Sequence, residues 1–277
     1  MILCIINRRI RILSSFPTHW ISIHPVKMQL CEQNEAFVEQ DGGLVFDHTK
    51  LILRQDDDYF YARSSERELV PTPPDANINF NQLELNKIDM ESVFPPMQSR
   101  HTPAPSPAPA NSYTKRPNLI SYGDSPSSNK DIGRQVLAEV EACEVLRANP
   151  HPNIAAYLGC VIEKGRITGL CFMRYCVTLR QRLQEEKEFD KELCFSKIES
   201  GVRHMHSLGF VHNDLNPTNV MMDEEDNPVV IDFDSCARMG ERLSKGGTVG
   251  WEVRESLYAK EENDLFGLER IREVLFN

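Results

Sequence analysis

Residues 211–236 constrain the fold of this chain more than any other stretch of its sequence. They are VHNDLNPTNVMMDEEDNPVVIDFDSC, in which two short apolar runs flank the acidic turn 223–227. This pattern predicts a tight hairpin between two buried strands. The hairpin would bring the loop that carries Asp214 and Asn219 back beside Asp232. Two carboxylates and an amide would then converge, and these are the oxygen ligands that a phosphate-bound Mg²⁺ requires.

The charge, hydropathy and cysteine content of the chain argue against several classes of protein. A formal net charge of −10 over 277 residues, without a basic stripe, predicts no nucleic-acid or anionic-membrane binder. Apolar runs long enough for a transmembrane helix do not occur, so we expect no membrane span. The eight cysteines contain no Cys-x-x-Cys pair, and most lie in apolar runs. They predict reduced core thiols in an intracellular, cytoplasmic protein rather than a disulfide frame or a zinc site.

The first 27 residues differ in composition from the rest of the chain. Three arginines lie among isoleucine and leucine, and no acidic residue occurs before Glu32. We expect residues 1–27 to be a disordered or targeting extension ahead of Met28. Mitochondrial targeting by this segment is the alternative to a cytoplasmic location.

Composition shifts predict the domain organisation of the remainder. Residues 44–62 predict two strands joined by a turn, within a small β-containing module over 28–94. Residues 95–112 are rich in proline, alanine and serine, which favours extended polyproline geometry and predicts a linker that buries nothing. The main domain would then span 113–277.

Helical periodicity appears twice in that main domain. A helix is predicted over 129–148, because apolar residues recur there at helical spacing. These residues are Val136, Val140, Cys143 and Leu146. A second helix is predicted over 190–208, and it leads directly into the loop that carries Asp214.

The order His-x-Asp-x-x-x-x-Asn, hairpin, Asp-Phe resembles the catalytic and metal loops of the protein kinase superfamily. The resemblance covers roughly 113–270 and is carried by KRP, PHPNI, GFVHNDLNPTN, IDFDS, GGTVGW and NDLFGLE. It is closest in type to a short, fungal-type divergent Ser/Thr protein kinase-like family. It implies an α+β, protein kinase-like two-lobe fold with a reduced N-lobe and a truncated helical C-lobe.

The resemblance also implies catalytic and metal-binding residues. Asp214 matches the catalytic aspartate, which accepts the proton of the substrate hydroxyl. Asn219 and Asp232 match the Mg²⁺ ligands. Asp264 resembles the aspartate that ties the following helix to the catalytic loop.

ATP binding is implied by two further groups of residues. Lys115 resembles the small-lobe lysine that pairs with the α/β-phosphates, and Glu141 resembles its helical partner. Glu141 is preferred to Glu139 and Glu144 because of its spacing to His151. The gatekeeper-plus-hinge segment, whose backbone would bond the adenine edge, matches Met173, Arg174, Tyr175 and Cys176. Met221 would lie beneath the base.

Four departures from the family pattern weaken the case for efficient catalysis. The sequence has no Gly-x-Gly-x-x-Gly before Lys115. Asn213 replaces the arginine that usually precedes the catalytic aspartate. Asn216 replaces a lysine, and Asp234 stands where the metal loop normally has glycine.

Three functions therefore compete. The first is a divergent protein kinase that uses ATP and Mg²⁺ and transfers the γ-phosphoryl group to a Ser or Thr hydroxyl of an unidentified protein substrate. The second is a pseudokinase, which acts as a nucleotide-binding or scaffold module. The third is a small-molecule phosphotransferase of the aminoglycoside or choline kinase type, whose signature also resembles HNDLNPTN followed by IDFD.

Overall fold

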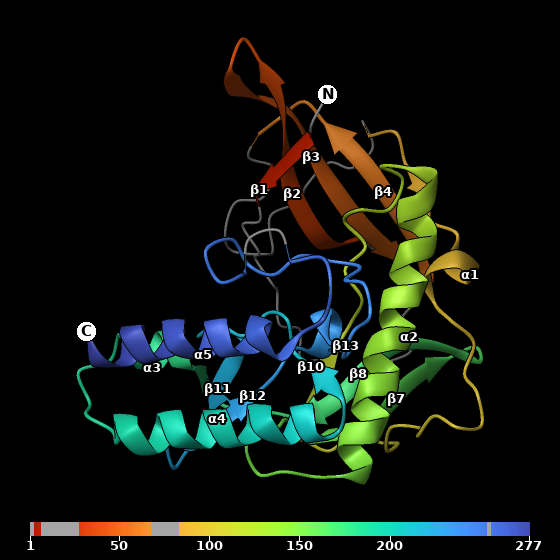
Figure 1. The fold of residues 1–277 in the computed structure, drawn as a ribbon. Coiled ribbons are helices and arrows are strands. Elements are labelled where there is room, and N and C mark those ends of the chain that lie inside the picture. Colours follow the sequence, from red (N-terminus) through yellow and green to blue (C-terminus); the bar gives the residue numbers. More distant parts are fainter. Residues whose placement is uncertain (1–2, 7–27, 68–82, 254–255) are drawn as a thin grey trace. The chain divides into compact units, whose positions relative to one another are not determined.

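The computed structural model describes residues 3–6, 28–67, 83–253 and 256–277. The expectation for residues 1–27 therefore concerns a segment that lies almost wholly outside the described residues. The chain divides into two compact units (Figure 1). The first comprises Met1–Val93 and Asn118–Ile132, and the second comprises Phe94–Pro117 and Gly133–Asn277.

The first unit is built on a five-stranded antiparallel sheet in the order β1-β2-β3-β4-β5. Its elements are β1 (Leu3–Ile6), β2 (Gln29–Gln40), β3 (Gly43–Gln55), β4 (Asp58–Ser64), β5 (Asn86–Lys87) and the short helix α1 (Met90–Val93). The hairpin predicted within 44–62 is confirmed, since Gln55 pairs with Asp58 across its turn. Leu51, Leu53 and Ala62 form the core beneath it.

A buried lysine holds segment 118–132 to this sheet. Lys50 is 4% exposed, and its Nζ donates to Tyr122 O at 2.6 Å and to Asp124 Oδ1 at 2.5 Å. Leu119 N donates to Glu32 Oε1 at 3.0 Å. A buried ammonium group requires such partners, and they fix 118–132 as part of the first unit.

The described residues of the second unit form three small sheets. The first, in the order β6-β8-β7, consists of β6 (Ser112–Lys115), β7 (Tyr157–Glu163) and β8 (Arg166–Met173). The second, in the order β12-β11-β9, consists of β9 (Val177–Thr178), β11 (Val220–Met222) and β12 (Pro228–Val230). The third pairs β10 (Phe210–Val211) with β13 (Ala237–Arg238). The mixed α+β class is confirmed.

The second unit also contains helices. They are α3 (Leu179–Arg182), α4 (Lys191–Ser207), α5 (Glu261–Phe276) and the greater part of α2 (Pro126–Ala148), with a short 3-10 helix, η2 (Phe233–Ser235). Asp190 caps α4, because its side chain accepts from Leu193 N. Both predicted helices are thus confirmed, and α4 and α5 pack along one another (Figure 1).

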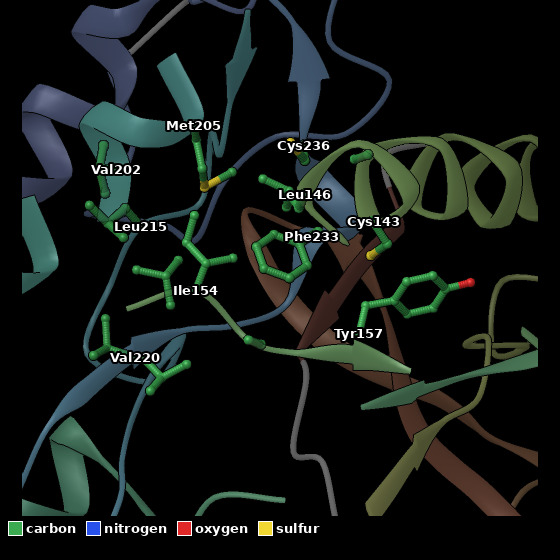
Figure 2. Packing of buried hydrophobic residues seen from close by; sticks show 14 of the residues in the cluster. Cys143, Leu146, Ile154, Tyr157, Val202, Met205, Leu215, Val220, Phe233 and Cys236 are labelled. Atoms are coloured by element: carbon green, nitrogen blue, oxygen red, sulfur yellow. The ribbon is translucent and has the colours of Figure 1, made fainter. Parts of the chain in front are cut away.

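One hydrophobic core joins these elements, and it includes the apolar face predicted for α2. Figure 2 shows Cys143 and Leu146 of α2 in one cluster with Val202 and Met205 of α4. Phe233 belongs to the same core, and its ring meets that of His212 at a centroid distance of 6.0 Å. This packing fixes the loops before β11 and after β12, which carry the predicted site.

The interpretation of 95–112 as a linker that buries nothing is wrong. Residues 94–111, which we call the strap, lie along β7 and β8 through backbone hydrogen bonds. Met97 N donates to Gly165 O at 2.9 Å, and Ala104 N donates to Cys160 O at 2.8 Å. The prolines donate nothing, but the residues between them supply the N–H groups. Within the described part of the chain, none of the helices has the length and apolarity to cross a membrane.

Candidate active site

Lys115, at the end of the edge strand β6, connects three segments of the second unit. Its Nζ lies 2.5 Å from Glu139 Oε1 on α2 and 2.5 Å from Asp232 Oδ1 after β12. Asp234 Oδ2 is 3.7 Å away. The lysine side chain is only 12% exposed, so this is a buried ion-pair cluster rather than a solvated surface contact.

Burial and charge act against each other in this cluster. Burial alone would lower the pKa of Lys115, but the carboxylates of Glu139, Asp232 and Asp234 outweigh it and raise that pKa. Burial raises the pKa of Glu139 to about 7, with Asp232 and Asp234 acting in the same direction and Lys115 in the opposite one. Lys115 is thus held by three carboxyl groups at once.

The predicted pairing of Lys115 with Glu141 is wrong. Glu141 Oε1 instead accepts from Arg100 Nη2 at 2.9 Å, in a pair whose side chains are 46% and 58% exposed. Residues two apart on an α-helix point about 200° apart. Glu139 and Glu141 therefore cannot both face Lys115, and Glu139 is the one that lies on the buried side. The sequence did contain the signal, because Glu139 shares a face with Val136 and Cys143.

The predicted return of the hairpin to the loop is confirmed. β11 and β12 are antiparallel, with Val220 opposite Val230. Ile231 N then donates to Asn219 O at 2.9 Å, and His212 Nε2 lies 2.9 Å from Ile231 O. These two contacts hold the loop beside the residue that precedes Asp232.

Asp214, the predicted catalytic aspartate, is held by hydrogen bonds to both carboxylate oxygens. Oδ1 accepts from Thr248 N at 2.7 Å and from Asn216 Nδ2 at 3.2 Å. Oδ2 accepts from Asn219 Nδ2 at 2.9 Å. Asn219 Nδ2 also donates to Asp214 O at 2.8 Å, so the amide nitrogen faces Asp214 and its oxygen is the atom that can ligate a cation.

Asp264, fully buried on α5, anchors the same loop as the resemblance predicts. Its Oδ2 accepts from His212 N and its Oδ1 from Asn213 N, both at 2.8 Å. His206 Nε2 lies 2.8 Å from Oδ2. Asn213 has a positive φ of 62°, which asparagine tolerates better than most residues. The anchor thus holds a locally strained backbone next to Asp214.

Asp232 and Asp234 lie on a loop of unusual conformation. Asp232 has φ 67° and ψ 74°, in the left-handed region, and directly precedes η2. Asp234 Oδ1 accepts from Lys245 Nζ at 2.8 Å. The side chain of Asp234, where glycine was expected, thereby links the loop that carries Asp232 to the segment that leads to Thr248.

Several backbone N–H groups of the predicted hinge already donate hydrogen bonds to other segments of the second unit. Met173 N donates to Ala156 O at 2.9 Å, and Arg174 N donates to Asn111 O at 2.8 Å. Cys176 N donates to Met222 O at 3.2 Å. Adenine recognition by this segment would therefore use its carbonyl oxygens or replace one of these bonds.

The other two members of the predicted adenine site are Tyr175, within the hinge segment itself, and Met221, on the neighbouring strand β11. Tyr175 Oη accepts from Ala156 N at 3.1 Å, so this side chain is also engaged within the second unit. Met221 is half-buried on β11, where it pairs with Thr178 of β9. β9 directly follows Cys176, so Met221 lies close to the hinge segment along the sheet.

The residues present fit a magnesium ion that is shared with phosphates. Within the described residues, no group of three or more His, Cys, Asp or Glu side chains is arranged to hold a metal ion alone. Mg²⁺ characteristically binds through one or two carboxylates together with substrate phosphates and water. Asp232 and the amide oxygen of Asn219 are oxygen donors of that kind.

The sequence matches the family model described as "Protein kinase domain" over residues 122–267, just over half of the chain. The chain therefore belongs to the protein kinase family. The match includes Asp214, Asn219, Asp232 and Asp264 but begins after Lys115.

Curated relatives are protein kinases as well. Sperm motility kinase Z of Mus musculus is 30% identical over 112 residues, which are 39% of this chain and 22% of the relative. Serine/threonine-protein kinase shk2 of Schizosaccharomyces pombe is 29% identical over 119 residues, 40% and 20% of the two chains. Serine/threonine-protein kinase Tao of Drosophila melanogaster is 28% identical over 154 residues, 53% and 14%. The matched region thus spans about a fifth or less of these relatives.

Proposed function

We propose that this chain is a divergent Ser/Thr-type protein kinase, which transfers the γ-phosphoryl group of ATP to a hydroxyl group of a protein. The observation that carries the proposal is the contact of Lys115 with both Glu139 and Asp232. Protein kinases require the corresponding lysine–glutamate pair and metal-binding aspartate to be in place together. Membership of the kinase family and the similarity to Ser/Thr kinases support the same proposal.

Asp214 would act as the base in this reaction. Its carboxylate would orient the substrate hydroxyl and accept its proton as the hydroxyl oxygen bonds to the γ-phosphorus. The bond from that phosphorus to the bridging oxygen breaks, and ADP leaves. A positioned general base contributes about 10²–10⁴ in rate. The hydrogen bonds from Thr248 N and Asn219 Nδ2 hold the carboxylate ready for this role.

The phosphates would be held from two sides. Lys115 would bind the α/β-phosphates while Glu139 keeps its ammonium group in place. Asn219 and Asp232 would hold Mg²⁺, which supplies positive charge to the phosphate oxygens when bound. Asn216 brings no charge where the family has lysine, and a lost charge-assisted contact lowers a rate by about tenfold to a hundredfold.

The second candidate is a pseudokinase that keeps the fold and the nucleotide without useful transfer. Two observations favour it. Cys176 N, in the predicted hinge, is already bonded to Met222 O. Asn216 is only 2% exposed, and its Oδ1 accepts from Thr218 N at 2.9 Å, so this amide is built into the loop.

A phosphotransfer assay separates these candidates. The chain would be incubated with radiolabelled ATP, Mg²⁺ or Mn²⁺ and generic Ser/Thr substrates, beside the variant Asp214→Asn. The kinase proposal expects label on substrate or on the chain itself, and little label with the variant. Absence of label from both proteins, with nucleotide binding intact, would favour the pseudokinase.

A further inference from the structure

We propose that the strap, residues 94–111, is a built-in clamp that sets the position of α2, with Thr102 as its positioning residue. Thr102 would act through Glu144 on α2, and α2 in turn carries Glu139 to Lys115. The catalytic consequence rests on the proposed function, whereas the clamp itself is a property of the second unit alone.

Thr102 donates hydrogen bonds to both carboxylate oxygens of Glu144 on α2. Thr102 N donates to Glu144 Oε1 at 2.6 Å, and Thr102 Oγ1 donates to Glu144 Oε2 at 2.8 Å. Hydrogen bonds to a charged acceptor are about twice as strong as neutral ones. Glu144 lies five residues beyond Glu139 and points about 140° away from it around the helix. The helix is therefore held from one side by the strap and from the other by Lys115.

The strap is itself fixed to β7 at Thr102 and at Ala104. Cys160 N donates to Thr102 O at 2.7 Å, and Ala104 N donates to Cys160 O at 2.8 Å. Gly159 makes this approach possible, because a Cβ there would lie 2.6 Å from Pro103 C and O and from Ala104 N. Gly159 also has a positive φ of 135°. This close contact with β7 fixes the position of Thr102, so that Thr102 can in turn fix Glu144.

The strap continues directly into the strand that carries Lys115. Arg174 N donates to Asn111 O at 2.8 Å, which fixes the end of the strap just before β6. One short stretch of chain thus holds α2 through Thr102 and presents Lys115 to Glu139. The strap also contacts α2 through the ion pair of Arg100 with Glu141. Both of these side chains are exposed, so this pair contributes little to stability.

One usual means of positioning this helix is altered in this chain. In protein kinases, phosphorylation of the activation loop is one means of positioning the helix that carries the glutamate. Here Asn213 replaces the arginine that would receive such a phosphate, and its amide donates to Val211 O at 3.0 Å and Ser235 O at 3.1 Å. In the proposal, the contact of Thr102 with Glu144 positions α2 without a phosphate.

The test compares four variants of the full chain. Thr102→Val removes the hydroxyl donor at constant shape, and Thr102→Ser retains it. Glu144→Gln removes the charge of the acceptor. Glu199→Gln is the matched control, because Glu199 also accepts two hydrogen bonds, and both come from Arg203 within the same helix, α4. The measurements are hydrogen exchange of amides 133–148 without nucleotide, the Kd for ATP with Mg²⁺, and KM for ATP against kcat.

The clamp predicts faster exchange of the α2 amides in Thr102→Val and Glu144→Gln, with Thr102→Ser and Glu199→Gln like wild type. It predicts an ATP Kd raised about tenfold, the equivalent of one charge-assisted hydrogen bond, and a larger change in KM than in kcat. Wild-type exchange in both Thr102→Val and Glu144→Gln would overturn the clamp. A wild type that binds no nucleotide would instead overturn the proposed function, and the exchange data would still decide the clamp.

Discussion

Lys115 Nζ and Asp232 Oδ1 lie 2.5 Å apart, although 117 residues separate them in the chain. The first residue ends strand β6, and the second follows strand β12 in the left-handed conformation. In the proposed function, Lys115 would bind the phosphates of ATP and Asp232 would bind Mg²⁺. The ion pair therefore marks the place where both ligands would enter.

Glu139→Gln should weaken ATP binding, whereas Glu141→Gln should leave it unchanged. Above about pH 7, where Glu139 is ionised, Glu139→Gln removes the charge that holds Lys115, so the ATP affinity should fall about tenfold to a hundredfold. Glu141→Gln changes an exposed pair and should have an effect near zero. Isothermal titration with ATP and Mg²⁺ measures both. Loss of binding in Glu141→Gln alone would contradict the assignment of Glu139.

The raised pKa of Glu139 predicts a particular dependence of stability on pH. The unfolded chain releases this proton near the ordinary value of 4.5, whereas the folded chain holds it up to about 7. The folded state binds more protons between these values, so this contribution to the free energy of unfolding falls as pH rises through that window. The amide in the variant Glu139→Gln does not titrate, so the free energy of unfolding of the variant lacks this dependence on pH.

Urea unfolding of wild type and Glu139→Gln from about pH 5 to about pH 8 checks this linkage. The variant should gain stability relative to wild type toward the upper end of that range. Two stability curves that run parallel would show that Glu139 does not titrate there.

Asp264→Asn should destabilise the loop that carries Asp214. An amide has only one acceptor oxygen, so the buried N–H of either His212 or Asn213 would lose its partner. The free energy of unfolding should fall by about 1–3 kcal/mol, as measured by urea denaturation. Glu262→Gln, exposed on the same turn of α5, is the control and should match wild type within about 0.5 kcal/mol. Equal stability of all three proteins would refute the anchoring role.

Asn216→Lys should raise phosphotransfer. The new ammonium group would supply the missing charge-assisted contact, worth about tenfold in kcat. The change also removes the acceptor of Thr218 N and Oγ1, so a stability cost of about 1 kcal/mol is expected. Steady-state assays and thermal unfolding measure the two effects. A folded variant with unchanged or lower kcat would count against the proposed position of the transferring group.

The sequence was sufficient to predict the loop and the hairpin, because both depend on short-range patterning. The anchor at Asp264 spans about 50 residues and was implied only by the resemblance to protein kinases. Apolar runs around the turn 223–227 require antiparallel pairing, and that pairing alone brings Asn219 near Asp232. The partner of Lys115 was missed because counting residues to His151 ignores the rotation of the helix. The phase of the apolar face, set by Val136 and Cys143, favours Glu139.

The strap was missed for a different reason. A proline-rich composition favours extended geometry, but it does not say whether another strand lies alongside. The decisive partners, Gly159 and Glu144, lie far along the chain, and nothing local to 95–112 identifies them. The inclusion of Asn118–Ile132 in the first unit similarly depends on Lys50, a contact across 72 residues.

The most direct test of the nucleotide site is thermal unfolding with and without ATP and Mg²⁺, on wild type and on Asp232→Ala. Ligand at about 100 times its Kd adds ~2.7 kcal/mol to stability, which shifts Tm by several degrees. We expect a shift in wild type that depends on Mg²⁺ and disappears in Asp232→Ala. No shift in wild type at millimolar nucleotide, or an equal shift in the variant, would contradict the assignment of Asp232 and the proposed function with it.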